Sequence, residues 1–456
     1  MSNVVYRKIG MHKGKKRIWF EGQKLSFHGI EPGMQYSLEP DSDTHQIKII
    51  FKKDGDLTVS RRKNKDNYLP VMDVRSDDIQ AVFGDAERIR AVIHSDKIVI
   101  TIHHRDIAQK ERLDRIINKL LSNEALEVGS LAHGGGILDH ALHTGFNMSD
   151  VKTRLNFAVE IERKYLDSSQ RNNPIWDKES IAIEAPMQDV EISKLTRKIE
   201  ILVAGLPCTG ASISGKSKNK LSRAEEHETA GGLFIAFLNF ITALQPSIIV
   251  LENVTEYQDT ASMTVIRHVL TEIGYVLHET ILEGNEFGAL ESRKRLCVVG
   301  MTKGLEGFNV DNIIPLREKE PCLNSVLETI PDDSYRWKNK DSAKAKEIKD
   351  KKAGNGFRRN AVTGIEVKCK TIGAGYARIR QTETSLKHPS KELERILTPR
   401  EHAKVKTIPV NLIDGLSDTV AHQVLGNSVI HCAFQAVGKA IGETINFNIN
   451  KLKIAA

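Results

Sequence analysis

The sequence has few cysteines, and they follow no pattern that binds a metal or builds a disulfide scaffold. The five thiols in 456 residues are Cys208, Cys297, Cys322, Cys369 and Cys432. None belongs to a C-x-x-C pair, and no histidine pair has the spacing of a zinc site. Their odd number and wide separation indicate free thiols in a reducing compartment, and we expect no bound metal.

Long apolar runs are also missing. Residues 1–16 carry basic side chains with no apolar segment after them, which argues against a signal peptide. The most apolar stretch, residues 231–254, is interrupted by Asn239, Gln245 and Pro246. It is typical of a buried helix followed by a buried strand, not of a membrane span. We therefore expect a cytoplasmic protein with no membrane partner.

Positive charge is distributed unevenly. The whole chain has a net charge of +7. Residues 1–65 have 14 Lys and Arg against 7 Asp and Glu, so this segment alone also carries a net charge of +7. Residues 338–359 have 9 basic against 3 acidic side chains. Each stretch alone is compatible with a solvated surface. Two such stretches on either side of the apolar centre of the chain indicate a polyanionic partner.

The first part of the chain, residues 1–105, has the composition of a β-rich domain. Short runs rich in β-branched and aromatic residues occur at 17–20, 45–51, 90–95 and 97–104, with turn signals between them. Residues 107–122 then show helical periodicity, so we expect a linking helix within 106–124. The amino-terminal domain could bind DNA, or it could be a structural or oligomerising domain.

Strands and helices alternate through residues 125–302. Apolar runs at 126–132, 156–162, 199–205, 247–254 and 295–301 are separated by helical segments. This rhythm predicts an α/β fold with a doubly wound, mostly parallel sheet. Ligands of such sheets bind outside the carboxyl ends of the strands. The segment 134–136, Glu160, Cys208 and Glu252 follow or end these runs, so we expect them to converge on one crevice.

The alternation weakens after Thr302 and returns near Leu397. Residues 303–394 are polar and basic, with glycine-rich loops. Thr398 and Pro399 then have the pattern of a helix N-cap and first turn, with Glu401 three residues after the cap. We expect residues 395–456 to return to the α/β domain and to end in a long amphipathic helix over 426–445.

Each chemically suggestive residue also has an ordinary structural explanation. The glycines after the first strand could form a tight turn, Glu160 a surface charge, Cys208 a core thiol and Glu252 a helix cap. Taken in order, however, the segments SLAHGGGILDHALHTGF, VEIE, QDV, GLPCTGAS, LENV, ESRKRLCVVG, RILTPREHAKVKTIP and LGNSV resemble the motifs of the DNA cytosine-5 methyltransferases. The resemblance covers about residues 126–446 and depends on the order as well as the content of the motifs.

That resemblance implies a methyltransferase fold, S-adenosyl-L-methionine as cofactor, and double-stranded DNA as partner in a bacterial or phage cell. Methyl transfer to carbon 5 of a flipped-out cytosine would proceed through a covalent adduct. The implied catalytic residues are Cys208 as nucleophile, Glu252 as proton donor, Arg293 holding the base or the loop, and Arg295 in a structural ion pair. The implied cofactor-binding residues are Leu131, Gly135, Gly136, Glu160, Asp189, Pro207, Leu233 and Asn427.

The resemblance also places a target-recognition region at 303–394 and a closing loop after Cys208. Candidate DNA contacts are Lys216 and Lys218 in that loop, and Arg358, Arg359, Arg378 and Arg380 in the recognition region. The chain departs from the family at Leu131, His133, Thr209 and Glu291, where the family has phenylalanine, glycine, glutamine and glutamine. The first two positions bear on cofactor stacking, and the other two lie beside the base and the DNA.

Other functions fit the same motifs. One branch of the family methylates tRNA, and a DNA-binding regulator could retain the fold without turnover. A cognate restriction endonuclease is a possible partner, and the protein would be associated with the nucleoid.

Overall fold

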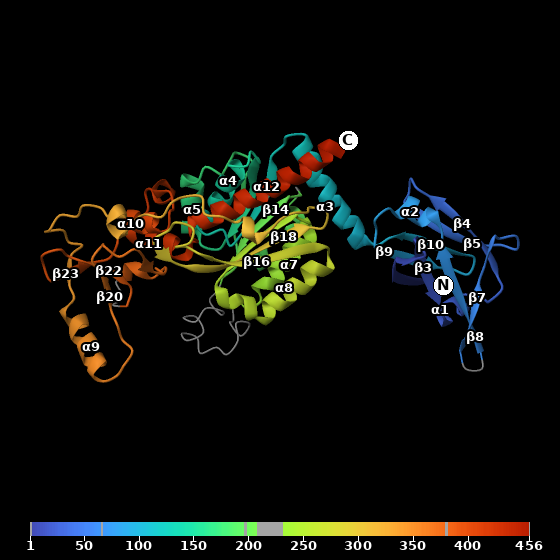
Figure 1. Ribbon diagram of the computed structural model, residues 1–456, viewed down its shortest axis with the longest axis horizontal. Coiled ribbons are helices and arrows are strands. Elements are labelled where there is room, and N and C mark those ends of the chain that lie inside the picture. Colours follow the sequence, from blue (N-terminus) through green and yellow to red (C-terminus); the bar gives the residue numbers. More distant parts are fainter. Residues whose placement is uncertain (1, 65–66, 196–197, 208–230, 379–381, 456) are drawn as a thin grey trace. The chain divides into compact units, whose positions relative to one another are not determined.

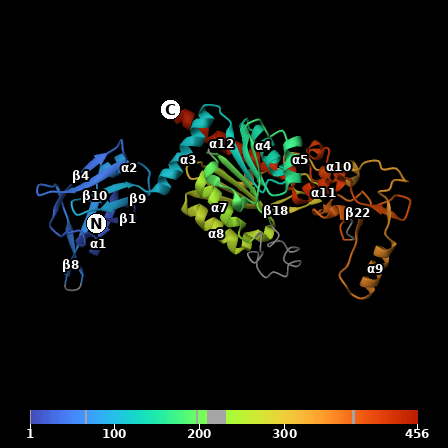
Figure 2. The same cartoon turned by 180° about the vertical axis from the view of Figure 1, so that it is seen from behind.

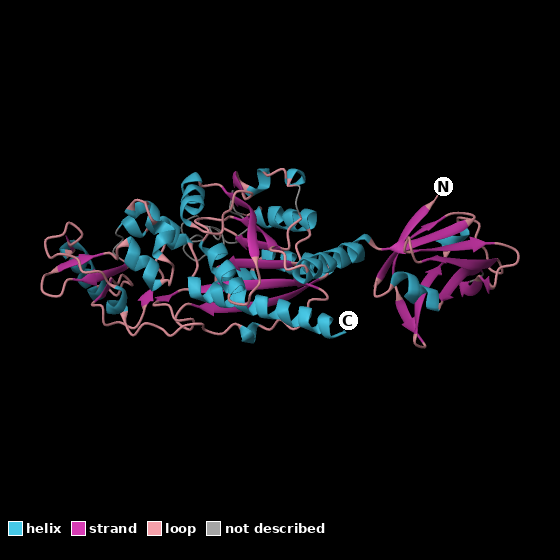
Figure 3. Cartoon of the chain, turned by 90° about the horizontal axis from the view of Figure 1, so that it is seen from above, coloured by secondary structure: helices cyan, strands magenta, loops and turns pink. Residues whose placement is uncertain are grey.

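The computed structural model describes residues 2–64, 67–195, 198–207, 231–378 and 382–455. It divides into two units, Met1–Glu111 and Arg112–Ala456, and the boundary falls within helix α3 (His104–Leu121). Figure 3 shows that the first unit consists mainly of strands, whereas the second alternates strands and helices.

The amino-terminal unit is built from two antiparallel sheets. One has the strand order β1-β9-β10-β5-β4-β6 and the other β2-β3-β8-β7. Apolar side chains of both sheets, among them Ile47, Ile98, Phe20 and Met72, form a single core. The elements are β1 (Asn3–Lys8), β2 (Gly10–His12), β3 (Lys15–Glu21), α1 (Gln23–Ser26), β4 (Gln35–Asp41), β5 (Gln46–Phe51), β6 (Leu57–Thr58), β7 (Ser60–Asn64), β8 (Asn67–Arg75), α2 (Asp77–Phe83), β9 (Arg88–Ile93) and β10 (Lys97–Ile102).

The strands expected in this unit are present as β3, β5, β9 and β10, and the helix expected at 107–122 is α3. The sequence patterns did not reveal β1, β4 or β8. These strands contain charged residues or prolines at exposed positions, such as Pro40 in β4, which dilute a pattern based on apolar alternation.

A seven-stranded sheet forms the centre of the second unit. Its order is β13-β12-β11-β14-β15-β18-β16. The first five strands in that order run parallel, whereas β18 is antiparallel to both β15 and β16. The strands are β11 (Leu126–Leu131), β12 (Thr153–Glu160), β13 (Ile181–Glu184), β14 (Ile201–Gly205), β15 (Ile248–Asn253), β16 (Tyr275–Glu283) and β18 (Lys294–Thr302).

The expectation of a mostly parallel sheet is confirmed, but the β16–β18 pair was not foreseen. A parallel connection needs a crossover of about a dozen residues or more, usually through a helix. The segment between β16 and β18 contains only the short strand β17 (Glu291–Ser292). The chain therefore turns back and pairs antiparallel.

Both faces of this sheet are covered by helices (Figure 1). Ile201 and Val203 of β14 face the core that includes α4 (Ile137–Asn147) and α12 (His431–Ala455). Leu202 and Ala204, one residue out of step, face the core that includes α7 (Leu233–Leu244) and α8 (Ala261–Glu272). Figure 2 shows the same two layers from behind. Burial on both faces explains why these strands are continuously apolar.

The part of helix α3 that belongs to the second unit is held there by buried polar contacts. The Arg112 guanidinium is 1% exposed, donates to Gln245 Oε1 at 2.5 Å and to the Ile273 carbonyl at 2.7 Å, and lies over the Tyr275 ring. One turn later, Arg115 Nε lies 3.0 Å from Oε1 of the buried Glu200.

The polar region after Thr302 contains small sheets. One is a four-stranded sheet, β19-β23-β22-β20, and the other pairs β21 in parallel with β17, which precedes this region. Their shared core includes Leu290, Tyr376, Leu397 and Val405, so it draws on residues from both sides of the expected 303–394 region. The remaining elements are α5 (Arg163–Asn172), β19 (Lys338–Asn339), α9 (Asp341–Lys352), β20 (Asn360–Val362), β21 (Cys369–Lys370), β22 (Thr384–Lys387), β23 (Leu393–Arg395), α10 (Pro399–Val405) and α11 (Asp418–Asn427), with short 3-10 turns between them.

The expected helix start at Thr398 is confirmed. The Thr398 hydroxyl accepts from the Glu401 N–H, and the Glu401 carboxylate accepts from the Thr398 N–H at 2.7 Å. Arg395 binds the same carboxylate through both terminal nitrogens, at 2.6 and 2.7 Å. The long amphipathic helix expected at 426–445 is also present, as α12, but it begins at His431 because α11 and a short turn precede it.

No helix in the described part of the chain is long and apolar enough to cross a membrane. The described residues also contain no group of three or more His, Cys, Asp and Glu side chains that could hold a metal ion.

Candidate active site

Four adjacent parallel strands deliver the predicted site residues to one edge of the sheet. In the order β12-β11-β14-β15, they end at Glu160, Leu131, Gly205 and Asn253. A Cβ atom placed on Gly205 would lie 3.6 Å from Oε2 of Glu252 and 3.8 Å from the Ala132 carbonyl. The glycine loop and Glu252 therefore flank the end of β14, which leads directly to Pro207 and Cys208.

Glu252 is largely buried and paired with one arginine. Its Oε1 lies 2.9 Å from Nε of Arg295, and the two side chains are 12% and 15% exposed. Burial raises the pKa of Glu252 above the usual value of a glutamic acid, and the positive charges of Arg295, Arg293 and Lys406 offset only part of that effect. A carboxyl group in this state can keep a proton to donate.

The neighbouring residue Asn253 fixes the end of β15. Its side-chain amide donates to the Leu206 carbonyl at 3.3 Å, and its Oδ1 accepts from the Val254 N–H at 2.8 Å. The end of β15 and the segment before Pro207 are thereby held together. Pro207 itself is exposed.

The glycine loop has a backbone that other residues adopt only with strain. Ala132, Gly134 and Gly136 have φ angles of 51°, 58° and 71°. A Cβ on Gly136 would lie 2.4 Å from Ser169 Oγ, and one on Gly135 would lie 2.5 Å from Cγ1 of Val424. Gly134, in contrast, faces open space. Two of the glycines thus permit close packing, and Gly134 leaves room beside Glu160.

His133, which replaces a glycine of the family, is buried in a polar network. Its Nδ1 lies 2.9 Å from Ser130 Oγ and 3.0 Å from Asp139 Oδ2, and its Nε2 lies 2.8 Å from Ser169 Oγ. The ring also meets the edge of Trp176. The departure at His133 is therefore accommodated inside the fold rather than on the face of the site.

The Glu160 carboxylate is hydrogen-bonded to the glycine loop. Its Oε2 accepts from the Gly134 N–H at 2.6 Å, and its Oε1 accepts from the Glu162 N–H at 2.9 Å. Each oxygen keeps a further lone pair. Gly134 faces open space beside this carboxylate, and the side chains of Asp189 and Asn427 are exposed.

Several other predicted residues lie elsewhere or offer less than expected. Leu131 is 1% exposed and belongs to the core on the α7 side, so it presents almost no surface for a cofactor ring. Leu233 begins α7 and is half-buried against the same core. Arg293 is 4% exposed and donates to the Gly426 carbonyl at 3.0 Å, so the structure does not support a direct contact of this guanidinium with a base. The expected ion pair of Arg295 is present, and its partner is Glu252.

The arginines of the polar region separate into two kinds. Arg359 is paired with two carboxylates, with Nε 2.9 Å from Glu347 Oε2 and Nη1 2.5 Å from Glu394 Oε1, and its expected role in DNA binding stays a prediction. Arg358 and Arg378 are exposed. Cys208, Lys216, Lys218 and Arg380 lie outside the described residues, and their roles stay predictions.

One residue near the site was missed by sequence reasoning. Lys406 is fully buried at the end of α10, and its Nζ lies 3.3 Å from Oε1 of Glu291. Burial, with the nearby charge of Arg293, lowers the pKa of Lys406 to about 7. The available signals were the acid at 291, a departure from the family, and a lysine next to Val405 and close to Ile408.

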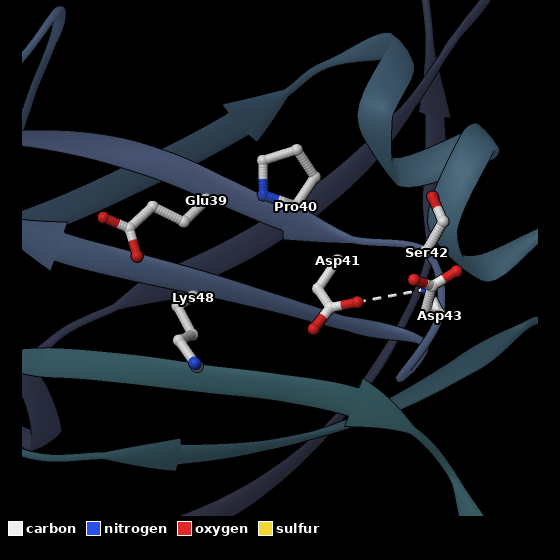
Figure 4. Close-up of a pocket in the computed structure, with 6 residues that line it drawn as sticks. All are labelled: Glu39, Pro40, Asp41, Ser42, Asp43 and Lys48. Atoms are coloured by element: carbon white, nitrogen blue, oxygen red, sulfur yellow. Dashed lines mark hydrogen bonds between the residues drawn. The ribbon is translucent and has the colours of Figure 1, made fainter.

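A hollow in the amino-terminal unit contains none of the predicted site residues. It lies along β4 and β5 and is lined by Glu39, Pro40, Asp41, Ser42, Asp43 and Lys48 (Figure 4). The Asp41 carboxylate accepts from the N–H groups of Asp43 and Thr44, at 3.1 and 3.0 Å. These bonds account for the acidic turn as a local structural feature.

Comparison with known proteins shows the family of the chain. The family model of the C-5 cytosine-specific DNA methylases matches residues 126–443. The chain belongs to this family, whose members are methyltransferases, and residues 1–125 lie outside the match.

Curated relatives are similar over more than half of the chain. The type II methyltransferase M1.ScrFI of Lactococcus lactis subsp. cremoris is 28% identical over 253 residues, which cover 54% of this chain and 63% of the relative. The type II methyltransferase M.HpaII of Haemophilus parainfluenzae is 29% identical over 293 residues, which cover 58% and 78%. The similarity thus spans just under two thirds of the first protein and more of the second.

Solved structures share the fold. A crystal structure of S. pombe Dnmt2 methyltransferase superposes with a TM-score of 0.55 at 18% identity, covering 71% of this chain and 99% of that one. The Entamoeba histolytica methyltransferase EhMeth gives the same TM-score and identity, covering 70% and 98%. At this identity the likeness establishes the α/β methyltransferase fold and nothing finer.

Proposed function

We propose that this protein transfers a methyl group to carbon 5 of a cytosine in a specific sequence of double-stranded DNA, through a covalent adduct with Cys208. The observation that carries the proposal is Glu252. It is a largely buried carboxyl group with a raised pKa, paired with Arg295 beside the strand end that leads to Pro207 and Cys208.

The reaction requires a nucleophile from the enzyme because carbon 5 of cytosine is by itself only weakly nucleophilic. The Cys208 thiolate adds to carbon 6 of the ring while Glu252 donates a proton to N3, which leaves carbon 5 electron-rich. S-adenosyl-L-methionine, when bound, supplies the methyl group that carbon 5 takes up. N3 then returns its proton to Glu252, a base takes the proton from carbon 5, and departure of the Cys208 thiolate restores the ring.

Arg295 is the better candidate for contact with the base. Its guanidinium fixes one carboxylate oxygen of Glu252, so that the other is free to face the ring. Glu160, Gly134, Asp189 and Asn427 would hold the cofactor, with Gly135 and Gly136 allowing the loop to pack closely. Leu131 would act through the core behind the site.

The target base must leave the duplex to reach this edge of the sheet, at a cost of a few kcal/mol. We expect the loop after Cys208, with Lys216 and Lys218, to close on the DNA once the base has entered. Arg358, Arg378 and Arg380 are the candidates for groove contacts from the recognition region.

The amino-terminal unit would increase the affinity for DNA through contacts with the phosphate backbone. Every residue of β7 is exposed, including Arg61, Arg62 and Lys63. Arg61 lies over the ring of the exposed Tyr68 on the paired strand, 4.7 Å from its centroid. A two-stranded antiparallel ribbon of this kind fits a major groove.

The test of the proposal is a covalent trap on DNA. Wild-type protein should methylate a defined motif, read by bisulfite sequencing, and should form an adduct with fluorocytosine at that motif, because carbon 5 then has no proton to lose. Cys208→Ser should do neither, whereas Cys322→Ser, at a half-buried free thiol outside the seven-stranded sheet, is the control. An adduct at another cysteine, or methylation of tRNA in place of DNA, would contradict the proposal.

A further inference from the structure

A fully buried ion pair connects two segments that are far apart in the sequence. Glu291 in β17 and Lys406 at the end of α10 are both 0% exposed, and their charged atoms lie 3.3 Å apart. Removing two charges from water costs several kcal/mol per ion, so a buried pair is a weak explanation for stability alone. A pair of this kind often specifies how two elements are arranged.

Arg293 extends the pair to the loop at Ile372 and to the end of helix α11. Its Nη1 lies 3.4 Å from Glu291 Oε1 and donates to the Ile372 carbonyl at 3.4 Å, and its Nη2 donates to the Gly426 carbonyl at 3.0 Å. The N–H of Ile372 donates to Glu291 Oε1 at 3.3 Å. Glu291 thus binds the N–H of Ile372, and Arg293 binds its carbonyl group.

The same segment is attached along its length. Cys369 donates its N–H to the Leu290 carbonyl at 2.8 Å, and the Thr371 hydroxyl donates to the Ser292 carbonyl at 2.7 Å. On the other side, a Cβ on Gly426 would lie 2.3 Å from the Ala374 nitrogen. Residues 369–374 are therefore held between the segment 290–293 and the carboxyl-terminal end of α11 at Gly426.

The charges in this cluster depend on Glu291. It is the anion that faces two cations, Arg293 and Lys406, and burial already lowers the pKa of Lys406 to about 7. Without the carboxylate, Arg293 and Lys406 would lose the anion that lies within 3.4 Å of both, and the pKa of Lys406 would fall further, which leaves a buried amine without its carboxylate. The glutamine that the family has at this position would not need Lys406 as a partner.

We propose that Glu291 is a positioning residue for target recognition, with Lys406 as its counter-charge. Together they hold Cys369–Arg378, which ends in the exposed Arg378, at a fixed place relative to β18, the strand that carries Arg295. The consequence for DNA rests on the function proposed above. The positioning itself does not, because it can be measured without turnover.

Cys369 provides a local probe. It is 3% exposed and lies at the start of the held segment, whereas Cys297 and Cys432, at 1% and 2%, lie in β18 and α12. Alkylation of native protein, mapped by peptide mass spectrometry, therefore separates local opening from global unfolding. In Glu291→Gln we expect Cys369 to react about tenfold faster or more, equivalent to about 1.4 kcal/mol of opening free energy, with Cys297 and Cys432 still protected.

The decisive measurement is the effect of Lys406→Met in two backgrounds. Alone, it leaves the Glu291–Arg293 pair in place and should raise Cys369 labelling only slightly. Added to Glu291→Gln, it replaces a buried amine that has lost its carboxylate with an apolar side chain, and should lower the labelling. The matched controls are Glu306→Gln and Lys451→Met, which alter an exposed pair 3.4 Å apart and should change nothing.

Two labelling results would overturn the positioning role. One is a Cys369 that stays protected in Glu291→Gln, and the other is a double variant that reacts as fast as that single variant or faster. If Glu291→Gln does not fold, the double variant decides: a folded protein with protected Cys369 supports the proposal, and an unfolded one contradicts it.

Methylation assays then test recognition separately. Glu291→Gln should raise the KM for DNA and increase methylation at sites that differ from the motif by one base pair, while kcat at saturating DNA changes much less. The double variant should recover part of this loss. An exposed Cys369 with unchanged KM and motif would show that the segment does not take part in recognition. A wild-type protein with no methylation would disprove the proposed function and leave the labelling result standing.

Discussion

The guanidinium of Arg295 lies 2.9 Å from one carboxylate oxygen of Glu252, and both side chains are largely buried at the carboxyl end of β15. The carboxyl group nevertheless has a raised pKa, because burial outweighs the neighbouring positive charges. A proton donor is thereby kept next to a cation, and the first two predictions concern these two roles.

Glu252→Gln should lower the single-turnover rate of methylation by about 10²–10⁴-fold, the usual contribution of a general acid. Cofactor affinity should stay nearly unchanged, since Glu160 and the glycine loop lie on other strands. Because the Glu252 pKa is raised, the reactive protonated form persists to higher pH than in an ordinary glutamic acid. The wild-type rate should fall as the pH rises through the pKa of Glu252. A rate-against-pH series checks this. Loss of cofactor binding in the variant would instead indicate a structural role.

Arg295→Met and Arg293→Met should fail in different ways. Arg295→Met should reduce the rate by about 10²–10³-fold, as expected when one electrostatic interaction at a reacting centre is removed, and should move the alkaline limb to still higher pH. Arg293→Met should chiefly reduce stability, by about 3–5 kcal/mol, since it leaves buried Glu291 without one partner. Thermal unfolding and single-turnover rates, measured on both variants, separate the two outcomes. If both variants lost rate and stability to the same extent, the assignment of Arg295 to the reaction and of Arg293 to stability would be contradicted.

The arginines of the recognition region should also differ. Arg378 is exposed, so Arg378→Ala should relax or shift the methylated motif by about 1–3 kcal/mol of discrimination if it contacts guanine. Arg359 is held by Glu347 and Glu394, so Arg359→Ala should lower stability and leave the motif unchanged. Bisulfite sequencing and urea unfolding test the pair together. A changed motif in Arg359→Ala would show that this arginine reaches DNA after all.

The exposed ribbon of the amino-terminal unit should contribute only electrostatic affinity. Replacing Arg61, Arg62 and Lys63 with glutamine should weaken DNA binding and reduce the slope of log K against log salt by up to about 3, because each phosphate that a basic side chain neutralises contributes about 0.9 to that slope. The methylated motif should not change. Lys451→Gln with Lys453→Gln, at the exposed end of α12, is the control and should leave the slope unaltered. A different motif in the ribbon variant would mean that the ribbon reads sequence.

A buried histidine pair should make the second unit sensitive to acid. His140 Nδ1 lies 2.8 Å from His431 Nε2, and burial lowers their pKa values from 6.5 to about 4 and about 3. Both rings are therefore neutral in the folded protein, while the unfolded chain takes up protons below pH 6.5. The stabilisation is complete above that pH and is lost as pH falls from 6.5 through 4 to 3.

The measurement is the free energy of unfolding of the second unit at pH 7.5 and pH 5. His431→Gln should reduce the wild-type loss between these values by about 2 kcal/mol, since one pKa unit corresponds to about 1.36 kcal/mol. His268→Gln, an exposed site on α8, should reduce it by much less. Identical pH profiles for His431→Gln and wild type would exclude this source of acid sensitivity.

The sequence by itself determined which segments carry the chemistry and in what order. Apolar runs that are buried on both faces can hardly be anything but central strands, so β11, β12, β14 and β15 and the edge at which they end were predictable. Local signals were equally reliable. The cap at Thr398 depends on only four consecutive residues, and the structure has it as expected.

Only the tertiary structure decided which polar side chains face the site and which face each other. Leu131 is turned into the core, Arg359 toward two carboxylates, and Arg295 rather than Arg293 toward Glu252. Glu291 and Lys406 meet across 115 positions of sequence, at 3.3 Å. Periodicity and spacing report the faces of a single element, whereas these pairings depend on how separate elements pack, and no local pattern in the chain encodes that geometry.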